Sequence, residues 1–261
     1  SQVVSQPSPA GRDEGHEMGV EWGPWSFSVT QRPSTGVAVT DVRFRGERVL
    51  YELALMDSQA IYGGSVRDTF MYSDSAYTMS QMSVSLIPGV DCPDGARFLP
   101  AANWMMPTSQ PANVSGVREF FPICVFEWDE DHTLWRHMDG NMARGLVRKT
   151  IVVRSIATVG NYDYIMDMKF REDGEINVIT LLAGYPETRF PGEGEERFST
   201  IVRPGVAGII HSHHVAWKAD LDIVGGINAL RTTEVKEHDS YGLGVNWKAA
   251  PGERRFPTKI L

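Results

Sequence analysis

Several features that mark particular classes of protein are missing from this sequence. Lysine and arginine number 25 against 33 acidic residues, so the net charge is −8. A nucleic acid needs a basic face on its protein partner, and this charge argues against such a partner. No apolar run reaches the length of about 18 residues that a membrane span requires, and the polar start has no signal-peptide core. No repeat at solenoid or propeller spacing is visible.

Cysteine is also scarce, because Cys92 and Cys124 are the only two. They permit one disulfide that closes a loop of about thirty residues and contributes roughly 3 to 4 kcal/mol in theory. Two buried free thiols explain the same residues equally well. Asn113-Val114-Ser115 is the only glycosylation sequon. A sequon and a disulfide are typical of the secretory route, so we expect an extracellular or secretory location.

What the sequence does contain is a series of short alternating segments separated by turn residues. The 25 glycines and 15 prolines are spread along the chain, which favours many strands and turns and no long helix. Residues 1–18 are polar and predict a flexible leader. We therefore expect an all-β fold in which ordered pattern begins at Trp22, with strands at about 25–29, 37–44, 49–55, 82–86, 121–128, 147–156, 162–170, 176–182, 206–224 and 229–235.

Three details of this pattern make the prediction specific. The parity of the apolar residues changes near Asp41, which predicts a bulge or bend. The acidic residues 129–131 are expected to close the strand before them, and residues 92–116 form a long irregular span. Residues 185–197 are charged and rich in Gly and Pro, so we expect a loop at the surface or at an entrance.

The segment Thr158-Val159-Gly160-Asn161-Tyr162-Asp163-Tyr164 leads into the strand at 162–170. Side chains two apart share a face of a strand, so Tyr162 lies on the same face as Tyr164 and the apolar residues that follow. Tyr162 can be a core residue whose hydroxyl has found a partner. It can also be a tyrosine that is chemically modified.

His211-Ser212-His213-His214 is the second local signal. On a strand His211 and His213 share one face and His214 points the other way, so the first two can offer two imidazoles to one copper or zinc ion. Two partly exposed histidines are the plain alternative.

Further along the same predicted strand lies Asp220-Leu221-Asp222. Two carboxylates on one face, with the Leu221 carbonyl between them, suit a calcium ion. Solvated acids at a strand end explain the same residues.

Taken together, these residues resemble a known family. Thr158-x-x-Asn161-Tyr162-Asp163-Tyr164, followed about fifty residues later by His211-x-His213, is similar to the catalytic domain of the copper-containing amine oxidases, in particular the diamine oxidase branch. Other matching segments are Gly46-Glu47-Arg48, Leu50-Tyr51-Glu52, Ile61-Tyr62-Gly63-Gly64, Pro88 to Pro93 and Cys124 to Glu127. The resemblance implies a partial large β-sandwich with long irregular loops over residues 19–261, whose C-terminal part is lacking.

The resemblance also implies a role for individual residues. Tyr162 matches the tyrosine that becomes topaquinone, and His211 and His213 match two of three copper(II) ligands. Tyr62 matches a tyrosine that hydrogen-bonds the quinone, and Asn161 is the neighbouring cofactor contact. The remaining matches are Asp74 as the catalytic base, Tyr72 and Tyr77 in the substrate channel, and Cys92–Cys124 as a family disulfide.

The implied activity is oxidative deamination of a primary amine by dioxygen to an aldehyde, ammonia and hydrogen peroxide. A quinone carbonyl is an electron sink, so a carboxylate such as Asp74 can remove the α-proton of a condensed amine. A homodimer is implied for a full-length protein. Here Tyr77 stands where the diamine oxidase branch has a tryptophan, which leaves the preferred amine open.

One departure limits the expected activity of this chain. The third copper histidine of the family lies in sequence that we expect after Leu261, because His16, His132, His137 and His238 fit no such motif. Two imidazoles bind copper less specifically than three, so we expect weak copper binding by this chain alone. The alternative is a truncated, non-catalytic β-sandwich that acts as a binding or interaction module.

Overall fold

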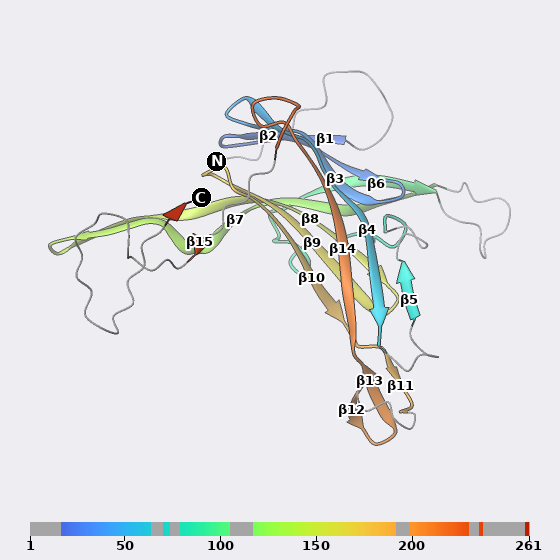
Figure 1. Cartoon of the computed structure of the whole chain (residues 1–261). Coiled ribbons are helices and arrows are strands. Elements are labelled where there is room, and N and C mark those ends of the chain that lie inside the picture. The colour runs from blue at the N-terminus through green and yellow to red at the C-terminus, as the bar shows by residue number, and fades with distance from the viewer. Residues whose placement is uncertain are drawn as a thin grey trace. The chain divides into compact units, whose positions relative to one another are not determined.

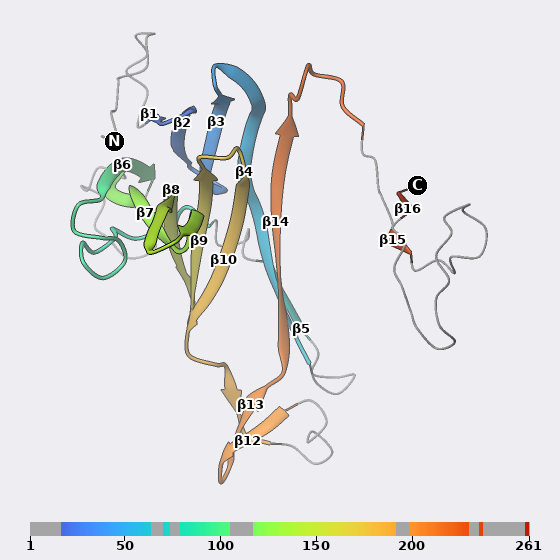
Figure 2. The ribbon, with the colours of Figure 1, turned by 90° about the vertical axis from the view of Figure 1, so that its left-hand side faces the viewer.

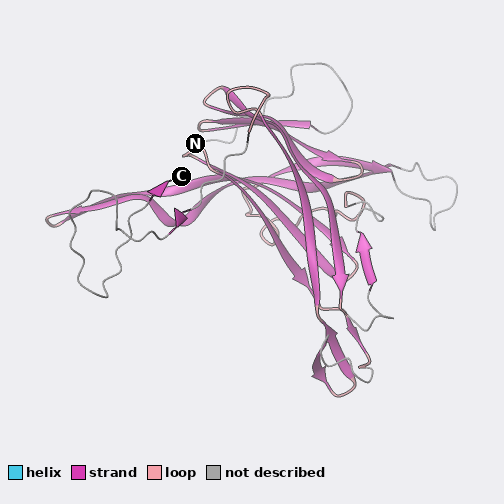
Figure 3. Ribbon diagram, in the orientation of Figure 1, coloured by secondary structure: helices cyan, strands magenta, loops and turns pink. Residues whose placement is uncertain are grey.

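The computed structural model describes residues 17–63, 70–73, 79–104, 117–191, 199–229, 235–236 and 259–260. Every element of regular secondary structure in these ranges is a β-strand (Figure 3). No helix in the described ranges is long and apolar enough to cross a membrane. The all-β prediction is therefore confirmed.

The chain divides into two compact units, Ser1–Val224 and Gly225–Leu261. In the second unit, β15 (Val235–Lys236) pairs antiparallel with β16 (Lys259–Ile260). Residues 230–234 of the predicted return strand at 229–235 lie outside the described residues, residue 229 is irregular, and Val235 begins β15. Everything below concerns the first unit.

The first sheet of this unit has six antiparallel strands in the order β1-β2-β3-β4-β14, with β5 beside the end of β4 (Figure 1). Its strands are β1 (Glu17–Trp22), β2 (Trp25–Arg32), β3 (Gly36–Phe44), β4 (Glu47–Tyr62), β5 (Phe70–Ser73) and β14 (His211–Leu221). β1 begins at Glu17, so the last two residues of the predicted leader, 17 and 18, belong to a strand. Asp41 has a positive φ of 47°, and the β2–β3 register shifts beside it, so the predicted bulge is confirmed.

The second sheet has five antiparallel strands in the order β10-β9-β8-β7-β6. Its strands are β6 (Arg97–Trp104), β7 (Val117–Asp139), β8 (Met142–Val159), β9 (Tyr162–Arg171) and β10 (Ile176–Gly184). A small third sheet combines β11 (Thr188–Arg189), β12 (Ser199–Arg203) and β13 (Val206–Ile209).

The two large sheets share one apolar core. β2 alternates buried and half-buried residues along its whole length, as a strand with one face on the core should. On β9 the predicted face is confirmed, since Tyr162, Tyr164, Met166, Met168 and Phe170 are all buried. Rings from both sheets meet in this core, and Phe27 of β2 stacks on Phe170 at 4.5 Å between ring centroids.

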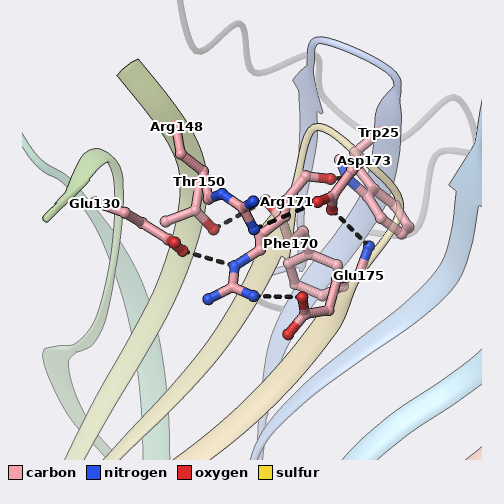
Figure 4. Close-up of polar contacts among 8 residues, drawn as sticks. All are labelled: Trp25, Glu130, Arg148, Thr150, Phe170, Arg171, Asp173 and Glu175. Carbon is pink, nitrogen blue, oxygen red and sulfur yellow. Dashed lines mark hydrogen bonds and ion pairs between the residues drawn. The ribbon is translucent and has the colours of Figure 1, made fainter. Parts of the chain in front are cut away.

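A group of polar contacts fastens the far end of β9 (Figure 4). Trp25 of β2 donates its indole N–H to the Arg171 carbonyl across the sheets at 2.6 Å. The Arg171 guanidinium in turn binds Glu130 of β7 at 2.7 Å and Glu175 after the turn. Charge-assisted bonds of this kind fix geometry strongly. β9 is thereby tied at one end, and its other end carries Tyr162.

Cys92 and Cys124 form a disulfide with 6.6 Å between their Cα atoms. Both are buried in a second apolar cluster with Leu86, Phe126 and Val152. The disulfide that the resemblance implied is therefore present, and the alternative of two free thiols is wrong.

Four boundaries differ from the prediction. Asp129 to Asp131 do not close the strand, because β7 continues through two register shifts to Asp139 and pairs with β8 as a two-stranded arm. Residues 82–86 form no strand beyond an isolated bridge at Ser83, whereas β6 lies inside the span expected to be irregular. The strand expected at 206–224 is broken between β13 and β14 at Ile210.

Candidate functional site

The candidate site lies where β9 of one sheet faces β14 of the other, near the lower ends of both strands in Figure 2. Two tyrosines of β9 meet two histidines of β14, each pair separated by 49 residues in the chain. Because Tyr-x-Tyr and His-x-His have the same spacing of two, each pair lies on one face of its strand and the partners match one to one. We call these two contacts the first and second Tyr–His pairs.

In the first pair the hydroxyl of Tyr162 lies 2.8 Å from Nε2 of His211. The other ring nitrogen, Nδ1, lies 2.8 Å from the Ile209 carbonyl oxygen. A carbonyl only accepts, so Nδ1 carries the proton and Nε2 accepts from the Tyr162 hydroxyl. The backbone thus determines which nitrogen of His211 holds a lone pair.

In the second pair the hydroxyl of Tyr164 lies 2.8 Å from Nδ1 of His213. Tyr164 is buried, and His213 is half-buried against the Tyr162 ring at 4.8 Å between centroids. The rings of His211 and His213 are 4.9 Å apart. His214 is exposed and contacts Ser212, as the alternation of a strand predicts.

Tyr62 of β4 lies beside the two Tyr–His pairs. It pairs with His211 in the β4–β14 register, and the two rings stack at 4.8 Å with an angle of 18°. Burial raises the pKa of the Tyr62 phenol well above its usual range, and its hydrogen bond with Tyr162 raises this pKa further. Tyr62 is therefore a neutral phenol at physiological pH and stays able to donate a proton to a hydrogen bond.

The loop after β10 forms the wall opposite the histidines. Gly184 has a φ of +95°, and a Cβ there would lie 2.2 Å from the Asn161 carbonyl oxygen, so only glycine fits. The next residue, Tyr185, donates its amide to that carbonyl at 3.0 Å. The loop borders an open pocket of about 240 Å³ lined by Tyr162, Leu182, Ala183, Gly184, Tyr185, Pro186, His211 and His213. This part of the loop predicted at 185–197 is thus at an entrance.

The donor atoms gathered here suit copper(II). Nδ1 of each histidine is hydrogen-bonded, which is the usual arrangement for imidazoles that bind a metal through Nε2. Two imidazoles and a phenol oxygen are ligands that copper accepts. Among the described residues, however, no group of three or more His, Cys, Asp and Glu side chains gathers at one point. The residues present fit copper as a partial ligand set.

Other predicted site residues lie elsewhere. Asn161 donates its side-chain amide to the Tyr185 carbonyl and so holds the loop, and its contact with the cofactor stays a prediction. Tyr72 pairs with Ala60 in the β4–β5 register. Asp74, Tyr77 and Asn113 lie outside the described residues.

The acidic group at the other end of β14 is engaged by cations of the chain. Asp222 accepts from Arg48 at 2.6 Å, and Asp220 lies 3.8 Å from the Lys218 ammonium. Leu221 is exposed at the strand end. The calcium site at these three residues stays a prediction.

Sequence reasoning gave no separate role to three participants. Tyr164 was placed on the correct face, but its pairing with His213 was not predicted, although the matching spacings Tyr-x-Tyr and His-x-His carry that signal. The other two are backbone groups: the Ile209 carbonyl, and the Glu187 amide, which lies 3.3 Å from the Tyr162 hydroxyl. The residue types at these positions do not indicate such contacts.

Comparisons with known proteins agree with this site. Residues 14–255 match the family described as copper amine oxidase, enzyme domain. Diamine oxidase from Mus musculus is 34% identical over 244 residues, which cover 90% of this chain and 31% of that protein. The lung isozyme of primary amine oxidase from Bos taurus is 32% identical over 208 residues, which cover 77% of this chain and 26% of that protein.

Solved structures agree as well. The Aspergillus nidulans amine oxidase has a TM-score of 0.75 at 25% identity over 93% of this chain and 31% of that one. Pichia pastoris lysyl oxidase also has a TM-score of 0.75, at 28% identity over 100% of this chain and 34% of that one. The chain thus spans about a quarter to a third of the length of these relatives. Its match over most of its own length shows that the chain belongs to the copper amine oxidase family.

Proposed function

We propose that this chain carries the copper-binding and quinone-forming strands of a primary-amine oxidase. The overall reaction converts a primary amine, dioxygen and water to an aldehyde, ammonia and hydrogen peroxide. The observation that supports it best is the Tyr162 hydroxyl at 2.8 Å from Nε2 of His211, with His213 beside it. A tyrosine that is to be oxidised with the help of a metal must lie next to the ligands of that metal.

Each residue then has a defined task. His211 and His213 hold copper(II) through Nε2, because their Nδ1 atoms are engaged. Tyr162 is the precursor of topaquinone, which supplies the electron sink for amine oxidation once it has formed. Tyr62 donates a hydrogen bond to the oxygen of residue 162, since burial keeps its phenol protonated. The pocket of about 240 Å³ beside Tyr162 has room for the end of a small amine.

Further parts of the proposal come from family membership. Asp74 is the base that removes the α-proton of the amine, and Tyr72 and Tyr77 belong to the substrate channel. Asn113 is a glycosylation site of a secreted protein, and the protein works as a homodimer. A calcium ion at Asp220, Leu221 and Asp222 stays a prediction, and the ion pairs of both carboxylates weigh against it.

A second function is favoured by one observation. The described residues bring two histidines together and no third ligand of the kind that completes a copper site. A chain with this partial set could be a β-sandwich that binds without catalysing. Copper binding and oxidation of Tyr162 separate the two functions.

The test adds copper(II) under air to the purified chain and follows the visible absorption of a quinone, with Tyr162→Phe as the matched control. We expect weak copper binding and a slight absorption that is absent in Tyr162→Phe. A strong band at stoichiometric copper would show that the ligand set is complete, with a ligand from a second chain or from residues outside those described. No quinone at saturating copper would contradict the role of Tyr162.

Turnover needs its own test. If the gene encodes sequence after Leu261, that longer protein is assayed for amine-dependent peroxide. Tyr162→Phe should abolish it, whereas Asp74→Asn should keep the quinone band and lose turnover by about 100-fold or more. Normal turnover in Asp74→Asn would mean that another group is the base.

A further inference from the structure

We propose that Tyr164 is a positioning residue that keeps the proton of neutral His213 on Nδ1, so that Nε2 carries the lone pair that would bind the metal. The inference rests on the proposed copper site, and it assigns a task to a tyrosine that is not a ligand. Its starting observation is the second Tyr–His pair, in which the Tyr164 hydroxyl lies 2.8 Å from Nδ1 of His213.

The geometry of the second pair is that of a directed hydrogen bond. The rings of Tyr164 and His213 are nearly perpendicular, at 74° with 5.6 Å between centroids, so they do not stack. At 2.8 Å the hydroxyl oxygen and Nδ1 are at the normal distance for a hydrogen bond, and Nδ1–H is its proposed donor. A neutral imidazole carries one proton, and a proton held on Nδ1 puts the lone pair that can bind a metal on Nε2.

The first pair shows the same arrangement made with the backbone. Nδ1 of His211 donates to the Ile209 carbonyl, which can only accept, so the tautomer of His211 does not depend on a side chain. His213 has a hydroxyl at the corresponding nitrogen, and a hydroxyl can donate or accept. The tautomer of His213 therefore depends on residue 164, and a substitution there can change it.

Packing alone does not explain a tyrosine at this position. Tyr164 is 1% exposed, and the next inward-facing residues of β9 are Met166, Met168 and Phe170, whose side chains make no strong hydrogen bonds. A buried hydroxyl costs free energy unless it is hydrogen-bonded, and phenylalanine would fill the same space without that cost. The hydroxyl at residue 164 is therefore explained by its contact with His213.

The direct test reads the tautomers of the metal-free chain from the nitrogen chemical shifts of labelled histidine, at a pH where both rings are neutral. In the wild type, Nδ1 should carry the proton in both His211 and His213. In Tyr164→Phe, His213 should shift toward the Nε2-protonated form, whereas His211 should stay unchanged because the Ile209 carbonyl remains. In the matched variant Tyr162→Phe, both tautomers should stay as in the wild type.

The unchanged His211 signal also reports that the fold around the site is intact in Tyr164→Phe. If His213 keeps its proton on Nδ1 in Tyr164→Phe, the inference is overturned. If the wild type already has the proton on Nε2 of His213, it is overturned as well.

The second readout is copper(II) affinity, measured by titration against a competing chelator. Loss of a partner behind a ligating histidine typically costs 10- to 100-fold in metal affinity, so we expect a loss of about this size in Tyr164→Phe. Tyr51→Phe is the control, because Tyr51 is 55% exposed and should leave affinity unchanged. Equal affinity in wild type and Tyr164→Phe would overturn the inference. No copper binding by the wild type would instead overturn the proposed function, and the tautomers would still decide the role of Tyr164.

Discussion

The two ends of β14 show how neighbouring strands decide what a metal-binding residue can do. At the first end, His211 and His213 face hydroxyl groups of β9, which are neutral partners at 2.8 Å. At the other end, Asp222 meets the guanidinium of Arg48 at 2.6 Å, and Lys218 binds the buried Glu52 at 2.9 Å. Both ends carry residue types that bind metals, but the partners at the first end are neutral and those at the second end are charged.

The difference lies in the charge of the partners. A hydroxyl or a carbonyl fixes an imidazole without neutralising it, so the ring remains a ligand. An arginine or lysine neutralises a carboxylate and occupies its oxygens, and a cation from solution must displace it. The neutral partners at the first end are compatible with metal binding. The ion pairs at the second end attach β14 to β4.

The largest expected effect comes from removing a ligand at the first end. His213→Ala should lower copper(II) affinity by more than about 100-fold, beyond the 10- to 100-fold that is typical of losing a partner behind a ligand. His214→Ala is the matched control, because His214 is exposed and contacts Ser212 on the other face of the strand. Titration of both variants measures the difference. Equal losses would mean that copper binds to loose surface histidines.

At the second end, breaking one ion pair should cost stability and leave copper affinity unchanged. Arg48→Met keeps most of the apolar stem but leaves the carboxylate of Asp222, which is 13% exposed, without its guanidinium. We expect a loss of about 1 to 2 kcal/mol in the free energy of unfolding, measured with urea. Arg43→Met, which breaks an exposed pair with Asp41, should cost less, because solvent screens an exposed pair. A smaller loss for Arg48→Met than for Arg43→Met would contradict the role of the second end.

The sequence was sufficient to predict the strand that carries the site. Alternation placed Tyr162 and Tyr164 on one face of β9 and separated His214 from His211 and His213, because strand side chains repeat every two residues. Alternation says nothing about which strand of another sheet faces that surface. The Tyr–His pairs join residues 49 apart on different sheets, so the resemblance to a family was needed to connect them.

The errors in the fold have a related cause. β7 runs past Asp129 to Asp139 because β8 supplies a hydrogen-bonding partner for its whole length. Residues 131–146 of this arm are exposed, so they lack the alternation of buried and exposed side chains that marks a strand in the sequence. The break at Ile210 between β13 and β14 was missed because residues 206–210 lead directly into the alternating residues of β14, and no turn residue marks the change of partner strand.

A smaller effect is expected from the pH dependence at the second end. Burial raises the pKa of Glu52, but hydrogen bonds from Lys218 and Arg32 outweigh it, so the pKa lies below the usual value of about 4.3. A carboxyl group with a lowered pKa in the folded state adds stability above its unfolded pKa and loses it as the pH falls through the folded value. In Glu52→Gln the free energy of unfolding should therefore fall less steeply than in the wild type as the pH drops below about 4.

The measurement is urea unfolding of wild type and Glu52→Gln at neutral pH and at about pH 3. Because Lys218 and Arg32 are partly exposed, we expect the wild type to lose at most about 1 kcal/mol more than the variant between the two conditions. Glu47→Gln, at an exposed position of the same strand, is the control. If Glu52→Gln lost as much free energy of unfolding at acid pH as the wild type does, the Lys218 contact would not be populated in solution.

The smallest effect is expected for calcium, and it tests the comparison directly. Calcium needs about six to eight oxygen ligands, and here it would have to displace Arg48 from Asp222 and compete with Lys218 for Asp220. We therefore expect a dissociation constant weaker than about 1 mM, with no change in the unfolding temperature at that concentration. Calorimetric titration of wild type and Asp222→Asn measures it. Binding tighter than about 0.1 mM that disappears in Asp222→Asn would show that both ends of β14 bind metals, and that ion pairing within the chain does not prevent it.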